Sequence, residues 1–166
     1  IDTTALGDED RVTRAILRRS LSALVEEERY PQRLVLFTTY AGWHTGFADL
    51  PDRHPFRDRR DVEAYVARLA AFPAYNRGGI ETTRAALAAG VAQPCAPLAG
   101  YERTMADVVA GPAERSRFLH PFERRPGAFP AAEWEALRAR AEGMVRDSVY
   151  PAYRALLAFY RQEYLP

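Results

Sequence analysis

The feature that most constrains the fold is the three- and four-residue spacing of apolar side chains in several stretches of the chain. This spacing places such side chains on one face of an α-helix. In the stretch from residue 58 to residue 72 they are Val62, Tyr65, Val66 and Leu69. We expect Asp58 or Asp61 to cap this helix and Pro73 to end it.

A first helix is predicted over residues 8–30. Its apolar residues are Val12, Ile16, Leu17, Leu21, Leu24 and Val25. Asp8 and Asp10 suit the positive end of the helix dipole, and Pro31 is expected to stop the helix.

Three further helical patterns follow, over residues 74–91, 97–111 and 130–166. Gly90 fits a C-terminal cap of the first of these. The last pattern contains Pro151, which removes one backbone donor, so a kink or break is expected near Ser148. Its four tyrosines, Tyr150, Tyr153, Tyr160 and Tyr164, indicate core packing, with a binding site as the alternative.

Together these patterns predict an all-α fold of five to six largely antiparallel helices with two long ordered loops. A single domain is expected. Its parts are an N-terminal helix (1–29), an irregular segment and loop (30–58), a three-helix segment (59–111), a loop (112–129) and a long kinked helix (130–166).

Composition excludes some classes of protein. The 23 basic and 22 acidic residues nearly cancel, so the chain lacks the positive charge of a nucleic-acid binder. No apolar run approaches the ~20 residues of a membrane helix, so we expect no membrane insertion. The one cysteine, Cys95, cannot form an internal disulfide and is expected to be a structural thiol.

The stretch Gly42–Phe56 holds two of the three histidines, His44 and His54, in a segment rich in glycine and proline. The two histidines are ten positions apart. In a helical zinc motif the two histidine ligands are four positions apart, on one face of the helix, so we expect no metal site in this chain. Either both histidines bond to backbone, or His44 lines a pocket. His120, between Leu119 and Pro121, is expected to be buried and hydrogen-bonded.

No nucleophile elbow, Walker loop, dinucleotide fingerprint or zinc-peptidase helix motif occurs in the chain. Carboxylate pairs such as Asp58/Asp61 and Glu133/Glu135 lie at predicted helix starts, where they serve the helix dipole. The residues alone therefore predict no catalytic group.

Several stretches jointly resemble the bacterial domain of unknown function 885, from about Tyr30 to the end of the chain. The resemblance rests on the order and spacing of these stretches. They are Gly42 and His44; Pro55-Phe56, Asp61 and Arg68-Leu69; Gly90 and Gln93-Pro94; and Pro151-Ala152-Tyr153, Leu156 and Glu163-Tyr164-Leu165-Pro166.

The resemblance implies a larger parent protein, since members are several hundred residues long and are placed with zinc-metallopeptidase-like helical proteins. Their metal-binding helix lies beyond the motif at Glu163–Pro166, so zinc would belong to a part that this chain lacks. The start at Ile1 also indicates a removed leader or a chain cut from a longer one. Many members carry export signals, which implies an extracytoplasmic parent.

Two functions are therefore expected. In the first, the chain is the N-terminal helical region of a zinc-dependent peptidase-like hydrolase, inactive alone and forming part of the cleft wall. Its partner is then the remainder of its own chain, and His44, Gln93 and Arg68 are the candidate cleft-lining residues. In the second, it is a stand-alone helical interaction module that pairs with a copy of itself.

Overall fold

The computed structural model describes residues 6–30, 32–127 and 129–165. It divides the chain into two compact units, Ile1–Leu34 and Val35–Pro166, where the sequence predicted one domain. The division follows from burial, because the helix of the first unit contributes no buried residue. The two units are described separately.

The first unit consists of helix α1 (Asp8–Glu27) and a 3₁₀ turn (Gln32–Leu34). Asp8, Glu9 and Asp10 occupy the first turn of α1, where their charge favours the helix dipole. The helix predicted here is confirmed. Pro31, which was expected to stop it, lies outside the described residues.

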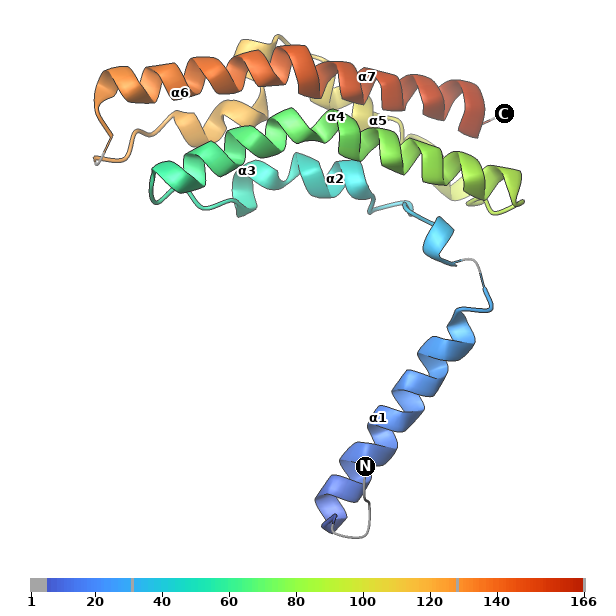
Figure 1. Ribbon diagram of the computed structural model, residues 1–166. Coiled ribbons are helices and arrows are strands. Elements are labelled where there is room, and N and C mark those ends of the chain that lie inside the picture. Colours follow the sequence, from blue (N-terminus) through green and yellow to red (C-terminus); the bar gives the residue numbers. More distant parts are fainter. Residues whose placement is uncertain (1–5, 31, 128, 166) are drawn as a thin grey trace. The chain divides into compact units, whose positions relative to one another are not determined.

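Seven α-helices occur in the described residues, which confirms the all-α prediction. Those of the second unit are α2 (Trp43–Ala48), α3 (Leu50–Arg53), α4 (Arg59–Ala88), α5 (Arg103–Ala106), α6 (Ala131–Met144) and α7 (Tyr150–Phe159). In Figure 1, α4 runs alongside α6 and α7, and α2 also packs against α4. None of the described helices is both long and apolar enough to cross a membrane.

Helix α4 is 30 residues long and continues through Pro73 to Ala88, so the predicted helix end at Pro73 is wrong. Proline removes one backbone hydrogen bond, to the carbonyl of Leu69. Phe72, Asn76 and Ile80 on either side of it are buried, so tertiary packing favours a continuous helix over a break. The Asp58 side chain caps α4 by accepting from Asp61 N–H, and Gly90 adopts a positive φ of 73° just after its end, both as predicted.

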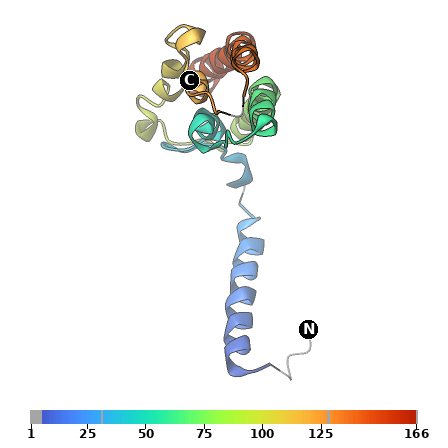
Figure 2. The same ribbon diagram turned by 90° about the vertical axis from the view of Figure 1, so that its left-hand side faces the viewer.

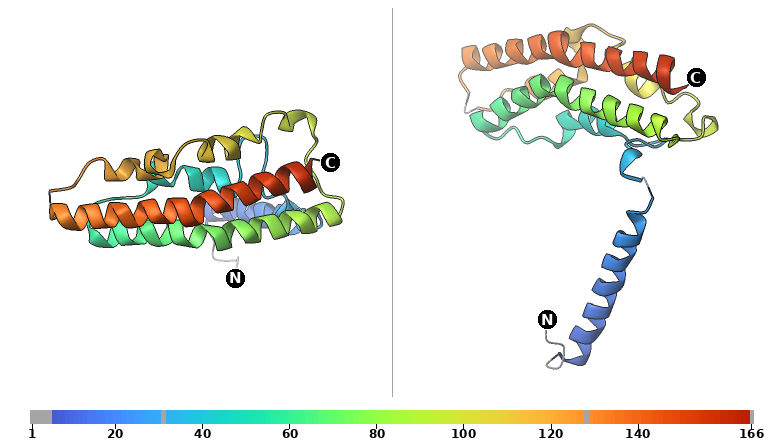
Figure 3. Two further views of the ribbon diagram at one scale, coloured as in Figure 1. Left: turned by 90° about the horizontal axis from the view of Figure 1, so that it is seen from above. Right: turned by 45° about the vertical axis from the view of Figure 1, so that its right-hand side comes forward.

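The long C-terminal helix is interrupted where the sequence predicted an irregularity. A π-helical turn (Val145–Val149) joins α6 to α7, and a second π-helical turn (Tyr160–Tyr164) follows α7. Pro151 cannot donate to the carbonyl of Asp147, which lies within the first of these turns. Seen from above in Figure 3, the segment nonetheless runs on as one long rod beside α4.

Two segments predicted as loops contain short helices. The segment 30–58 holds α2 and α3, and 112–129 holds two 3₁₀ helices (Ala113–Arg115 and Arg117–Phe122). Conversely, the helix predicted over 97–111 is broken into α5 and two 3₁₀ turns. Gly100 has a φ of 79°, which no α-helix accommodates.

Four parts of the second unit surround one core, as the end-on view in Figure 2 shows: α2–α3, α4, the segment 96–122 and α6–α7. The largest fully buried side chains include Trp134, Tyr65, Tyr153, Phe72 and Phe118. The Tyr65 hydroxyl donates to the Phe118 carbonyl (2.8 Å), which ties α4 to the 3₁₀ segment. The four tyrosines of the last helix are all buried, as predicted, whereas His120 is exposed and the prediction of its burial is wrong.

Candidate functional site

A hydrogen-bonded clasp joins three helices at the middle of the bundle. The indole N–H of Trp43 (α2) donates to Asn76 Oδ1 (α4) at 2.9 Å, and Asn76 Nδ2 donates to the Ala152 carbonyl (α7) at 2.9 Å. Asn76 is only 2% exposed, so both bonds lie away from competing water. The clasp fixes the plane of the Trp43 ring.

The same ring lies directly against the α4 backbone. A Cβ added at Gly79 would come within 2.5 Å of Trp43 Cε2, closer than any side chain permits. Gly79 therefore allows Trp43 to approach α4, and Asn76 then sets its orientation.

An open hollow of about 510 Å³ lies between α2 and α4. It is lined by Gly42, Trp43, Gly46, Phe47, Leu50, Arg68, Ala71, Phe72 and Tyr75. Phe47 stacks on Phe72 with ring centroids 3.8 Å apart, which gives the hollow a packed aromatic floor. We name it the Arg68 hollow, because that arginine is its only charged residue.

Arg68 differs from two other arginines of its helix, Arg59 and Arg84. Arg59 and Arg84, also on α4, form ion pairs with Glu133 and Glu163. Arg68 is exposed and forms no ion pair with any described residue. Its guanidinium is therefore open to an anion from outside the chain.

A second hollow of about 520 Å³ shares Trp43 and Tyr75 with the first. Its other lining residues are Leu36, Ala74, Gly78, Gly79 and Thr82, so it contains no charged side chain. We name it the neutral hollow. Both hollows lie along α4, the first beside residues 68–75 and the second beside residues 74–82. We refer to the two adjoining hollows together as the groove.

His44 lies inside the bundle and lines neither hollow. Thr104 Oγ1 donates to the Tyr101 carbonyl (2.8 Å), so His44 Nε2 must be the donor in its 3.0 Å bond to Thr104 Oγ1. Nδ1 is then an acceptor, and it has no partner among the described residues. Burial lowers the pKa of His44 to about 4 and keeps the ring neutral at pH 7.

The remaining expected residues have separate places. The backbone N–H of Gln93 donates to the Tyr164 hydroxyl (2.8 Å), and Gln93 lines neither hollow. His54 Nε2 donates to the Asp61 carbonyl (2.7 Å), a backbone bond that was one of the alternatives from the sequence. Of the three expected cleft-lining residues, only Arg68 faces a hollow.

Sequence reasoning missed Trp43, Phe47 and Tyr75 as parts of a site. One signal could have found Tyr75: Arg68, Ala71, Tyr75, Gly78 and Thr82 recur at three- and four-residue steps, on a second stripe of α4. Because the predicted helix ended at Pro73, the residues of this stripe were assigned to two different helices and were not recognised as one face.

In the described part of the chain, no group of three or more histidine, cysteine, aspartate or glutamate side chains could hold a metal ion.

Comparison with known proteins gives one match. The model of a family described as a bacterial protein of unknown function (DUF885) matches residues 1–166. No curated protein and no solved structure matches the chain.

Proposed function

Because the chain belongs to the DUF885 family, we propose that it is the N-terminal helical region of a larger zinc-dependent peptidase-like hydrolase. On its own it is inactive, and in the larger protein it forms part of the wall of a binding cleft. The observation that carries this proposal is the apolar face of α1, which no residue of its own unit covers.

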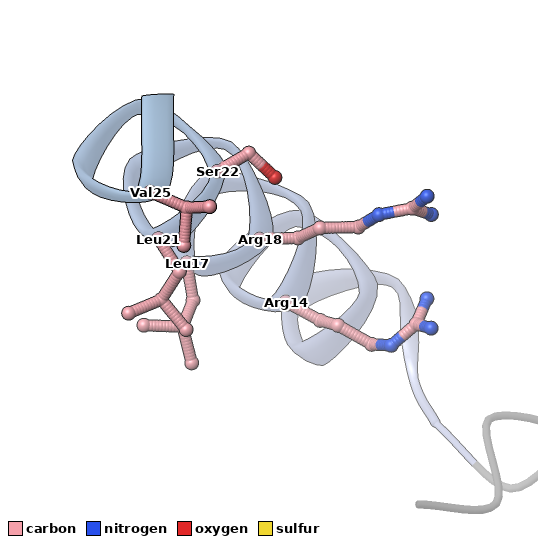
Figure 4. A pocket seen from close by; sticks show the side chains of 6 residues that line it. All are labelled: Arg14, Leu17, Arg18, Leu21, Ser22 and Val25. Carbon is pink, nitrogen blue, oxygen red and sulfur yellow. The ribbon is translucent and has the colours of Figure 1, made fainter. Parts of the chain in front are cut away.

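Helix α1 exposes an unusual amount of apolar surface. None of its residues is buried. Six large apolar side chains are more than half exposed: Val12, Ile16, Leu17, Leu21, Leu24 and Val25. In Figure 4, Leu17, Leu21 and Val25 point to one side of the helix, whereas Arg14 and Arg18 extend away from them.

Such a face is costly unless it is covered. Burying a leucine or valine side chain stabilises a protein by about 1.5–3 kcal/mol, so six of them represent a large unused contribution. Most helices in proteins owe their stability to packing of an amphipathic face rather than to helix propensity. A partner surface would supply that packing, and the remainder of a larger chain is the partner we propose.

In the part of the chain that the structure describes, His44 and His54 are engaged in other contacts and are not grouped as zinc ligands. His44 binds Thr104 and is enclosed by aromatic rings, and His54 binds backbone. In our proposal the zinc ligands therefore belong to another part of the parent, and no step of the chemistry is assigned to the residues described above.

The groove on α2 and α4 supports the cleft-wall part of the proposal. It lies on rigid helices, its central tryptophan is fixed by Asn76, and Arg68 presents an unpaired cation at its side. Preorganised surfaces of this kind suit substrate positioning.

A second candidate function rests on the same face of α1. If the chain is a stand-alone helical interaction module, a second copy covers α1 instead. Self-association of the 166-residue chain through α1 would favour this function over the first.

The experiment substitutes Leu17→Asp and Leu21→Asp together, both in the 166-residue chain and in the protein made from the longest reading frame that contains it. Urea unfolding should show a loss of about 3 kcal/mol or more in the longer protein, because two buried leucines are replaced by charges. The shorter chain should change little.

Ser22→Asp is the charge control. It adds one negative charge to α1, where the leucine pair adds two, and its side chain points away from those of Leu17 and Leu21 in Figure 4. An unchanged stability of the longer protein with both leucines replaced would overturn the proposal. Concentration-dependent dimerisation of the shorter chain, abolished by the leucine pair but not by Ser22→Asp, would replace it with the second candidate.

A further inference from the structure

The two hollows of the α2–α4 groove differ in charge but not in size. The Arg68 hollow measures about 510 Å³ and the neutral hollow about 520 Å³, and both adjoin Trp43 and Tyr75. Sites of roughly 300–1,000 Å³ hold small ligands. Each hollow therefore has room for one apolar group, and the shared aromatic pair separates the two groups.

The walls of both hollows are apolar or aromatic. Phe47 and Leu50 line the first, and Leu36 and Ala74 line the second. Tyr75 is 58% exposed, so its ring is available for contact with an incoming group. Flat walls of this kind favour aromatic and branched aliphatic side chains.

Arg68 supplies the single charge of the groove. A guanidinium binds a carboxylate through two parallel hydrogen bonds. This contact selects a negatively charged ligand and also sets its orientation. Because the neutral hollow holds no charged residue, the complementary ligand carries its negative charge at one end only.

We propose that the groove binds the C-terminal end of an apolar peptide. The last side chain occupies the Arg68 hollow, its terminal carboxylate binds Arg68, and the preceding side chain occupies the neutral hollow. This inference rests on the proposed cleft wall and names its ligand class, and it requires nothing of α1.

The test uses the 166-residue chain and the probe N-acetyl-Leu-Phe, with its C-terminal amide as the neutral counterpart. Titration calorimetry should show that the acid binds at least about tenfold more tightly than the amide, the difference expected for one charge-assisted contact. Arg68→Gln should lower the affinity for the acid to that for the amide. Arg60→Gln, which changes an exposed arginine of α4 that lines neither hollow, should leave both affinities unchanged.

A second variant fills the site without disturbing the fold. A Cβ added at Gly46 meets no atom within 4 Å, so Gly46→Leu places a side chain in the Arg68 hollow at no cost to the core. Binding of both peptides should be lost, while urea unfolding shows no loss of stability.

Equal affinity for acid and amide, an Arg68→Gln variant that binds like the parent chain, or a Gly46→Leu variant that still binds would each overturn the inference. Such a failure would leave the α1 result standing, because the leucine substitutions are measured by unfolding and without any peptide. A failure of the α1 test would not affect the inference about the peptide, because the peptide affinities are measured independently of α1.

Discussion

Helices α1 and α4 look alike in sequence and differ in what they bury. Both have apolar residues at helical spacing, over 20 and 30 residues. Helix α4 buries ten of its residues, whereas α1 buries none. Periodicity therefore identifies a helix and its apolar face, but the surface that covers the face depends on the rest of the assembly.

The comparison extends to the second stripe of each helix. Helix α4 packs its main stripe into the core and leaves another along the groove. There the small residues Ala71 and Gly78 flank Tyr75, beside Trp43 of α2. Helix α1 has arginines beside its leucines, as Figure 4 shows. We interpret α4 as the scaffold of a binding surface and α1 as an element that docks.

The largest expected effect compares equivalent leucines on the two helices. Leu69→Ala on α4 should cost about 2–5 kcal/mol of unfolding free energy, because Leu69 is fully buried and its truncation leaves a cavity. Leu21→Ala on α1, where the side chain is 52% exposed, should change the stability of the 166-residue chain by less than about 0.5 kcal/mol. Urea unfolding of the two variants checks this difference, and similar losses would break the comparison.

A pH effect should follow, confined to the second unit. Burial lowers the pKa of His44 to about 4 in the folded chain, from an ordinary value of 6.5 in the unfolded chain. The unfolded state therefore binds the proton first as the pH falls. Stability is fully present above pH 6.5 and decreases by about 3 kcal/mol down to pH 4.

Urea unfolding between these pH values, with an NMR titration of the His44 ring, measures the effect. His120→Gln removes the signal of an exposed histidine and so helps to assign the His44 ring in the NMR titration. A His44 ring that titrates at 6.5 would contradict the burial of this residue.

A smaller effect distinguishes two neighbouring glycines of α4. Gly79→Ala should cost about 1–3 kcal/mol, since its Cβ would overlap the Trp43 ring. Gly78→Ala should stabilise the chain by about 0.5–1 kcal/mol, because its Cβ meets no atom and alanine favours the helix. Thermal unfolding and the fluorescence of Trp43 check the pair, and equal effects at both positions would show that Trp43 does not rest on α4.

The sequence predicted a helix correctly where one periodic stripe of apolar residues runs through the segment, as in α1 and the last helix. It failed at Pro73, because the core contacts of Phe72 and Ile80 outweigh the single hydrogen bond that proline removes. It also missed α2 and α3, since glycine and proline obscure so short a pattern.

Of the candidate site, the sequence identified Arg68 but not the ring that shapes the groove. The position of Trp43 depends on Asn76 and Gly79, which lie more than 30 residues away along the chain. A contact between residues so far apart in the sequence cannot be predicted from a local sequence pattern. His44 was chosen for its place between glycines, but its surroundings, including Thr104 and Tyr153, come from other helices.

The most direct test of the account is amide hydrogen exchange of α1 and α4, measured in the 166-residue chain and in the protein made from the longest reading frame that contains it. We predict that α4 is strongly protected in both and that α1 is protected only in the longer protein, because only there is its apolar face covered. Protection of α1 equal to that of α4 in the shorter chain at low concentration, or fast exchange of α1 in both proteins, would contradict the account.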